Sequence, residues 1–140
     1  MKFTTGRLRR LRVFIDANTL ISGLFFDGPE SQVLSRGILG TIDVMTCRFV
    51  VNEVKEVIRR KFPEERIDID GILSAITIVE TEATGRAAKL IRDKKDILVL
   101  NTALKHKPDY FITGDKDFHT LEIKKQIRIV TTKEFLEKHQ

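Results

Sequence analysis

The chain has 140 residues, of which 41% are hydrophobic and 32% are charged, and its formal net charge is +5. Only 8 residues are Gly and 3 are Pro, which excludes a disordered, collagenous or low-complexity protein, and the length suits one domain with a sizeable core. No apolar run approaches the roughly 18 residues of a membrane helix, and the first residues lack the apolar segment of a signal peptide. Because the single cysteine, Cys47, has no partner for an internal disulfide, we expect a reducing, cytoplasmic location and no membrane association.

The positive charge is concentrated at the start of the chain, where no acidic residue precedes Asp16. We expect residues 1–10 to form a basic arm ahead of a single domain over residues 11–140. Such an arm can pair with nucleic-acid phosphates by releasing their counterions, although a solubilising tail has the same composition. The candidate nucleic-acid-binding residues are Arg7, Arg9, Arg10 and Arg12.

The first predicted strand is a β-rich apolar run over residues 11–15, which ends at Asp16. Two short helices are expected over residues 19–26 and 31–39, because an Asp-Gly-Pro turn signal lies between them. Residues 44–47 are predicted to be the second strand.

The middle of the chain contains the clearest helical pattern, over residues 49–62, where the apolar side chains fall on one stripe. Pro63 ends this helix, and a short helix is expected over residues 64–73. Residues 76–79 are predicted to be the third strand, and the Ala-containing segment 83–92 is predicted to be an amphipathic helix.

The last third repeats the alternation of helix and strand. A helix is expected over residues 97–106, followed by strands over 110–113 and 127–130. A final helix over residues 133–138 is expected to be capped by Thr132.

Short apolar strands that alternate with helices indicate a parallel sheet buried on both faces. We therefore predict a three-layer α/β/α sandwich with a central, mostly parallel sheet of about five strands. In such sheets, ligands bind beyond the carboxyl ends of the strands, and this position directs the search for a site.

Four acidic residues occupy positions that this rule selects. Asp16 follows the first strand, Asp115 follows the fourth, and Asp96 and Glu53 lie early in predicted helices. Carboxylates held this close repel one another unless a cation binds between them. Oxygen ligands without a Cys or His pair favour Mg²⁺ or Mn²⁺, one or two ions of which can promote phosphodiester hydrolysis.

Each of these acids also has a purely structural interpretation. Asp16 and Asp96 are suited to capping a helix or to its first turn, and Asp115 follows a glycine as in an ordinary turn. Glu53 lies outside the apolar stripe of its helix and is explained equally by a solvent-exposed position. The combination of all four at these topological positions favours a site.

Three neutral residues near the acids are candidates for supporting roles. Asn18 and Ser22 follow Asp16 at a spacing of one helical turn, and Thr113 ends the fourth strand. Each can bind a carboxylate or a phosphate oxygen, or can satisfy a local backbone group instead. Asn101 lies within an apolar helix face, where a hydrogen-bonded core amide is the expected role.

Several segments resemble motifs of the PIN-domain ribonuclease family. Residues 13–22 (VFIDANTLIS) are similar to the opening motif, residues 96–104 (DILVLNTAL) to the third acidic motif, and residues 110–118 (YFITGDKDF) to the fourth. Glu53 matches the acid of the intervening helix, and residues 131–136 (TTKEFL) resemble the VapC-like toxin subgroup.

This resemblance implies a PIN-like fold and a Mg²⁺- or Mn²⁺-dependent endoribonuclease that acts on RNA. It also implies a homodimer and, for toxin members, a small antitoxin protein as partner. A role in RNA processing is the other possibility within the family. The acids that match the metal-binding and catalytic positions are Asp16, Glu53, Asp96 and Asp115, with Asp117 as an accessory metal-binding acid.

Two other functions compete with a ribonuclease. A haloacid-dehalogenase-like phosphatase also begins with an Asp motif, but its mechanism needs a second Asp where this chain has Asn18. A catalytically inert RNA-binding module can keep the fold, yet it gains nothing from four acids near phosphates.

Overall fold

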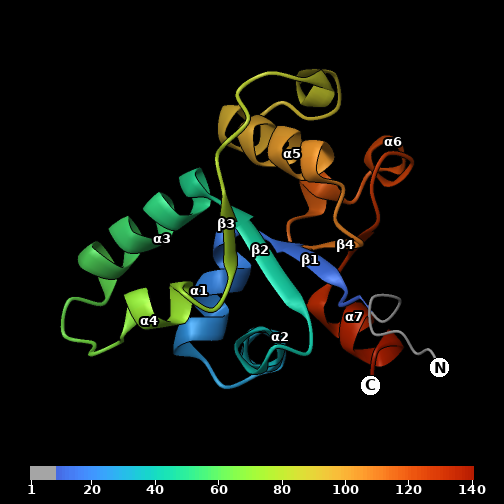
Figure 1. Cartoon of the computed structure of the whole chain (residues 1–140). Helices are drawn as coiled ribbons and strands as arrows, with labels where there is room; N and C mark the ends of the chain where they lie inside the picture. Colours follow the sequence, from blue (N-terminus) through green and yellow to red (C-terminus); the bar gives the residue numbers. More distant parts are fainter. Residues whose placement is uncertain (1–8) are drawn as a thin grey trace.

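A computed structural model describes residues 9–140 (Figure 1). Its core is a sheet of five parallel strands in the order β3-β2-β1-β4-β5, which confirms the predicted fold class. The strands are β1 (Arg12–Ile15), β2 (Asp43–Cys47), β3 (Thr77–Val79), β4 (Tyr110–Ile112) and β5 (Ile129–Val130).

The central strand β1 is covered on both faces. Phe14 pairs with Met45 of β2 on one side and with Phe111 of β4 on the other, and its ring packs edge-on against Phe111. Because successive side chains of a strand point to opposite faces, the burial of Val13, Phe14 and Ile15 means that both faces carry helices.

Helices form the two outer layers of the sandwich (Figure 1). The layer on one face holds α1 (Ala17–Phe25), α2 (Pro29–Leu39), α3 (Arg48–Lys61), α4 (Ile69–Leu73) and α7 (Thr132–Lys138). The opposite layer holds the 3₁₀ turn η2 (Arg86–Lys89), α5 (Lys94–His106) and α6 (Leu121–Lys124). A second 3₁₀ turn, η3 (Lys116–Phe118), follows β4.

The predicted helix over residues 83–92 is wrong, because only the short turn η2 forms there. Gly85 has a φ of 147°, which a helix does not permit. The N–H of Ala87 donates to the side-chain oxygen of Asn101 at 3.0 Å instead of to a helical carbonyl. Asn101 is therefore the buried core amide that its position predicted.

Two helix starts and one further helix also differ from the sequence prediction. The helix expected over residues 64–73 begins only at Ile69, because the carboxylate of Asp68 accepts the N–H of Gly71 and caps the helix there. Thr131, not Thr132, caps α7, and its hydroxyl and the carboxylate of Glu134 form a reciprocal capping box. The four-residue helix α6 was not predicted.

The strand order places a crevice between β1 and β4. The chain leaves β1 toward β2 on one side, whereas β5 lies beyond β4 on the other, so the connections that follow β1 and β4 run in opposite directions. Both of the strands that precede a candidate acid, β1 and β4, therefore open onto the same crevice. Within residues 9–140 no helix is long and apolar enough to cross a lipid bilayer.

Candidate active site

An acidic cleft of about 310 Å³ lies at the carboxyl edge of the sheet. The carboxyl ends of β1 and β4, the second turn of α3 and the start of α5 supply its walls, as the parallel arrangement requires. All five predicted acids line it, together with one further acid, a lysine and four other residues: Asp16, Glu53, Asp93, Asp96, Asp115, Asp117, Lys95, Ala17, Asn18, Val99 and Phe118.

Asp16 is the most rigidly held of these acids. It is buried, and one carboxylate oxygen accepts the N–H of Thr19 at 2.9 Å, which caps α1. The other oxygen accepts the hydroxyl of Thr113, a fully buried residue that follows β4. Asp16 is thus both a helix cap and a wall of the cleft, so the structural and functional interpretations of this residue hold together.

Asp96, Asp115 and Asp117 form the tightest group. Each offers one carboxylate oxygen, and these three atoms lie within 4.8 Å of one another. Partial burial, followed by the negative charges of Asp93, Asp115, Asp117 and Asp16, raises the pKa of Asp96 to about 6. Removing water and adding like charges both disfavour the ionised carboxylate, so this group is electrostatically unfavourable by itself.

Backbone geometry fixes the loop that carries Asp115 and Asp117. The N–H of Asp115 donates to the hydroxyl of Thr113 at 3.0 Å, and the N–H of Asp117 donates to the carboxylate of Asp115 at 2.9 Å. The Thr113 hydroxyl therefore joins Asp16 to the Asp115 loop. Sequence analysis had placed Thr113 near Asp115 but not in this bridging position.

The opposite wall of the cleft comes from α3 and α5. Glu53 lies on α3, and its carboxylate is 3.6 Å from the ammonium of Lys95 on α5. Asp93 caps α5 by accepting the N–H groups of Lys95 and Asp96, so Asp96 itself lies in the first turn and its carboxylate faces the cleft. Sequence reasoning missed Lys95, because its ion-pair partner Glu53 lies 42 positions away and nothing in the sequence indicates that the two side chains meet.

The remaining supporting residues are divided. Asn18 lines both the acidic cleft and a neighbouring pocket, whereas Ser22, one turn further along α1, lines the neighbouring pocket with Glu30 and Lys133 but not the cleft. His119 is partly buried, and its Nε2 lies 2.7 Å from the carbonyl oxygen of Thr113. His119 thereby closes the loop that carries the two aspartates.

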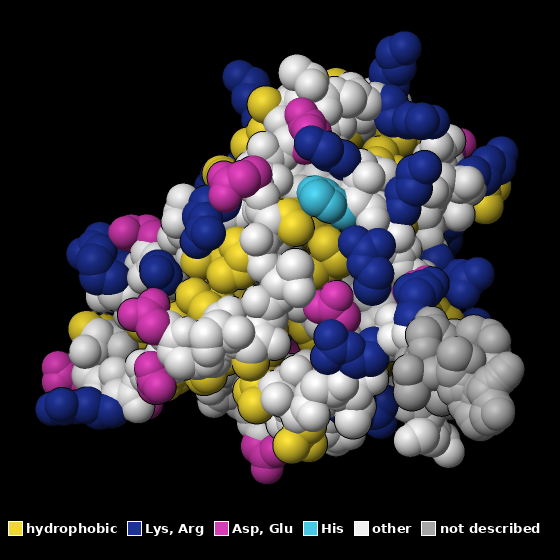
Figure 2. Space-filling model, in the orientation of Figure 1, with side chains coloured by type: hydrophobic (Ala, Val, Ile, Leu, Met, Phe, Trp, Pro, Cys, Tyr) yellow, Lys and Arg dark blue, Asp and Glu magenta, His cyan; other side chains and the backbone are white. Residues whose placement is uncertain are grey.

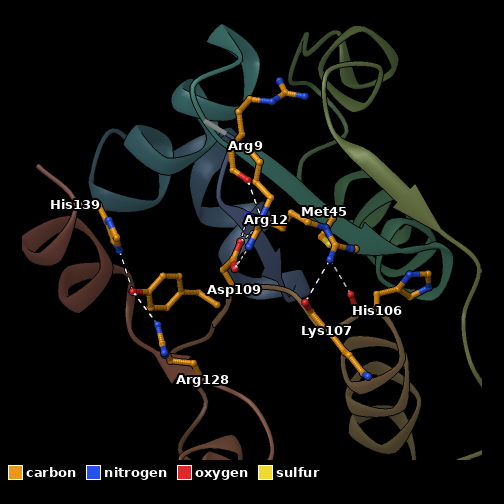
Figure 3. Close-up of polar contacts among 10 residues, drawn as sticks. Arg9, Arg12, Met45, His106, Lys107, Asp109, Arg128 and His139 are labelled. Atoms are coloured by element: carbon orange, nitrogen blue, oxygen red, sulfur yellow. Dashed lines mark hydrogen bonds and ion pairs between the residues drawn. The ribbon is translucent and has the colours of Figure 1, made fainter. Parts of the chain in front are cut away.

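Three of the four candidate RNA-binding arginines, Arg9, Arg10 and Arg12, lie at the other edge of the sheet. Arg9 forms two hydrogen bonds with Asp109, and the Arg12 guanidinium donates to the carbonyls of His106 and Lys107 at the end of α5 (Figure 3). Arg10 donates to the carbonyl of Gly40. Arg7 lies outside the described residues. Arg12 thus satisfies unpaired helix carbonyls, and RNA contact by the other arginines stays a prediction.

The donor set of the acidic cleft fits a hard divalent cation. Carboxylate oxygens dominate the lining, and neither Cys nor His belongs to it. Mg²⁺ and Mn²⁺ prefer such ligands, and a bound cation removes the repulsion that raises the pKa of Asp96.

Comparison with known proteins agrees with this geometry. The PIN domain family profile matches residues 12–117, a span that contains every acid of the cleft, and the chain belongs to this family. PIN domains are generally nucleases, which favours a nuclease over the phosphatase alternative. A search of the curated proteins found no match.

Two solved structures have the same fold. A chain in the crystal structure of VapBC2 from Rickettsia felis, bound to a DNA fragment from its promoter, is 14% identical, with a TM-score of 0.67 over 86% of this chain and 98% of that one. PAE2754 from Pyrobaculum aerophilum is 11% identical, with a TM-score of 0.60 over 91% of this chain and 94% of that one. At these identities the likeness concerns the fold.

Proposed function

We propose that this PIN-domain protein is a metal-dependent endoribonuclease that hydrolyses RNA phosphodiester bonds. The observation that carries the proposal is the group formed by Asp96, Asp115 and Asp117, whose nearest oxygens lie within 4.8 Å of one another beside the buried Asp16. Such concentrated negative charge costs folding free energy and opposes the approach of a phosphate unless cations neutralise it.

Asp96, Asp115 and Asp117 would hold Mg²⁺ or Mn²⁺, with Asp16 and Glu53 completing the set for one or two ions. A bound divalent ion supplies an activated water and positive charge for the phosphodiester in an in-line displacement. Other side chains of the cleft must then hold these carboxylates in place.

Each wall of the cleft has its own positioning contact. Thr113 orients Asp16 through its hydroxyl and joins it to the Asp115 loop. On the opposite wall, the ammonium of Lys95 lies close enough to orient Glu53 for water or a second ion.

The direct test is cleavage of a labelled single-stranded RNA by the wild type and by Asp16→Asn, with Mn²⁺, Mg²⁺ or EDTA. We expect wild-type cleavage that needs the metal and is lost in Asp16→Asn. Asp27→Asn, a change in the exposed turn between α1 and α2, is the matched control and should cleave normally. Wild-type rates in Asp16→Asn, or cleavage that persists in EDTA, would refute the assignment.

We further propose that the chain is the toxin of a toxin–antitoxin pair, that it acts in the cytoplasm as a homodimer, and that an antitoxin protein silences it. Its likeness to a chain of VapBC2 supports this. Expression in a bacterial host should arrest growth for the wild type but not for Asp16→Asn, and light scattering should give twice the chain mass. Normal growth with an active nuclease would argue for RNA processing instead.

A further inference from the structure

A second cleft lies at the opposite edge of the sheet. This basic groove of about 570 Å³ lies where β4 and β5 begin, between the end of α5, η2 and α6. Lys and Arg side chains gather on this side of the molecule, on the right in Figure 2. Five basic residues line the groove: Arg86, Lys107, Lys124, Lys125 and Arg128.

The single acid in the lining of the groove is already neutralised. Asp109 receives two hydrogen bonds from Arg9, at 2.9 and 2.8 Å, and a third from the N–H of Arg12 at 2.8 Å (Figure 3). None of the five basic side chains forms an ion pair within residues 9–140. Their positive charge is therefore available to a ligand.

Two of the basic groups are held in place by neutral partners. The guanidinium of Arg86 donates to the side-chain oxygen of Gln126 at 2.8 Å. That of Arg128 lies over the ring of Tyr110, 5.2 Å from its centroid. These contacts orient the arginines without neutralising them. Binding of a polyanion therefore costs less side-chain entropy, because these side chains are already ordered.

Lys107 adds a conformational argument. It is the only non-glycine residue with a positive φ, 49°, among residues 9–140, and it terminates α5 at a position where glycine is preferred. A lysine at this position accepts local strain, yet it contributes a cation to the groove. The strained conformation of Lys107 is explained if its positive charge binds a ligand.

We propose that the basic groove binds the phosphate backbone of the RNA at a distance from the bond that is cut. The inference rests on the proposed nuclease function. Asp96 and Lys107 lie at opposite ends of α5, about 16 Å apart at 1.5 Å per residue. A single strand that leaves the acidic cleft along α5 reaches the groove at the other end of this helix.

The lining favours a nucleic acid over an acidic protein. A protein partner needs buried apolar anchors, but the apolar residues of this groove are Leu104, Pro108 and Ile127, of which Ile127 is almost fully covered. No aromatic side chain lines the groove in the described part of the chain, so bases have nothing to stack on. Binding should be through phosphates and independent of base sequence.

The test is the affinity of a fluorescein-labelled single-stranded RNA of mixed sequence, measured by anisotropy in EDTA over a range of salt concentrations. Lys124→Ala/Lys125→Ala should weaken binding about tenfold and flatten the slope of log K against log salt by about 1.4, which is 0.7 for each lost phosphate contact. The matched control is Arg60→Ala/Lys61→Ala, an adjacent exposed pair at the end of α3, which should bind normally.

Lys107→Gly separates charge from folding. It removes a cation from the groove but suits the positive φ, so RNA affinity should fall while the melting temperature stays equal or rises. A structural role alone would move both in the same direction.

Wild-type affinity and salt slope in the Lys124/Lys125 variant, or an equal loss in the control, would overturn the groove assignment. Displacement of the RNA by polyglutamate at equal charge would also overturn it in favour of an acidic protein. Binding is measured without metal, so unchanged affinity in the groove variant would refute the groove assignment and leave the proposed nuclease function untouched. If the wild-type protein instead binds RNA through the groove but never cleaves it, only the nuclease function is refuted.

Discussion

The two edges of the sheet treat carboxylates in opposite ways. At the amino edge, hydrogen bonds from Arg9 hold the pKa of Asp109 below its usual range, despite some burial. At the carboxyl edge, burial and four neighbouring acids raise the pKa of Asp96 to about 6. Asp109 thus stabilises the fold when ionised, whereas Asp96 destabilises it.

This difference indicates which acids serve the fold and which serve a ligand. Acidic residues kept for stability acquire cationic or N–H partners, as Asp109 has. At the carboxyl edge Asp16 and Asp115 each accept a backbone N–H, yet the pKa of Asp96 stays raised, and a metal ion would supply the missing positive charge.

Asp115 and Asp109 lie just beyond the two ends of β4, so their Asn variants form a natural pair. Asp115→Asn should slow RNA cleavage at least about 100-fold with Mn²⁺ present, because a metal ligand is lost. Asp109→Asn should instead lower the free energy of unfolding by about 1 kcal/mol, because charge-assisted hydrogen bonds are weakened. Single-turnover cleavage and urea unfolding measure the two effects. Full cleavage activity in Asp115→Asn would remove the distinction between the edges.

Thr113 tests whether the acids must be held in place. Thr113→Val keeps the shape of this fully buried side chain but removes the hydroxyl that donates to Asp16. We expect Mn²⁺ affinity to fall about 10- to 100-fold, as for other residues that orient metal ligands. Calorimetric titration measures this, with Thr113→Ser as the variant that keeps the hydroxyl and the affinity. Equal affinities in the two variants would contradict the bridging role.

The pH dependence of stability has opposite signs at the two edges. Asp96 binds a proton more readily in the folded state, so its ionisation removes stability as the pH rises from about 4 to about 6, and the full cost remains above pH 6. In chelator at pH 7.5, Asp96→Asn should therefore raise the melting temperature by a few degrees, and below pH 4 the gain should vanish. A variant less stable than the wild type at pH 7.5 would contradict this.

Asp109 has the reverse dependence. Its contribution is complete above the unfolded pKa near 4 and is lost as the pH falls through the lowered pKa of the folded state. The destabilisation by Asp109→Asn should thus disappear in strong acid. Thermal unfolding of the variant and the wild type as a function of pH measures it, and a difference that persists at the lowest pH would refute the ion pair as its cause.

Much of the acidic cleft was predictable, because its acids follow strands or lie near helix starts, and this fold brings those positions to one edge of the sheet. Asp16 and Asp115 each follow an apolar strand, and parallel strands end at one edge, so their convergence followed from the pattern alone. Asp96 lies in the first turn of α5 and Glu53 in the second turn of α3, so both are near helix starts that the sequence pattern predicts. The cap assignment was less reliable: Asp93 rather than Asp96 accepts the free N–H groups of α5.

The features that were missed depend on tertiary contacts. Residues 83–92 have helical composition, but Gly85 and the side chain of Asn101 direct the backbone away from a helix. The basic groove combines residues from η2, the end of α5 and α6, and helix α6 was not predicted. The basic arm is contiguous in the sequence and is recognised there, whereas the residues of the basic groove are dispersed along the chain.

The central claim is that the carboxyl edge binds a divalent cation, and a crystal grown with Mn²⁺ tests it most directly. The anomalous difference map should contain a peak about 2 Å from carboxylate oxygens of Asp96 and Asp115, with Asp16 or Asp117 completing the site. The same map from Asp96→Asn crystals should have a weaker peak or none. A cleft without a peak at saturating Mn²⁺, or a peak confined to another part of the surface, would contradict the account.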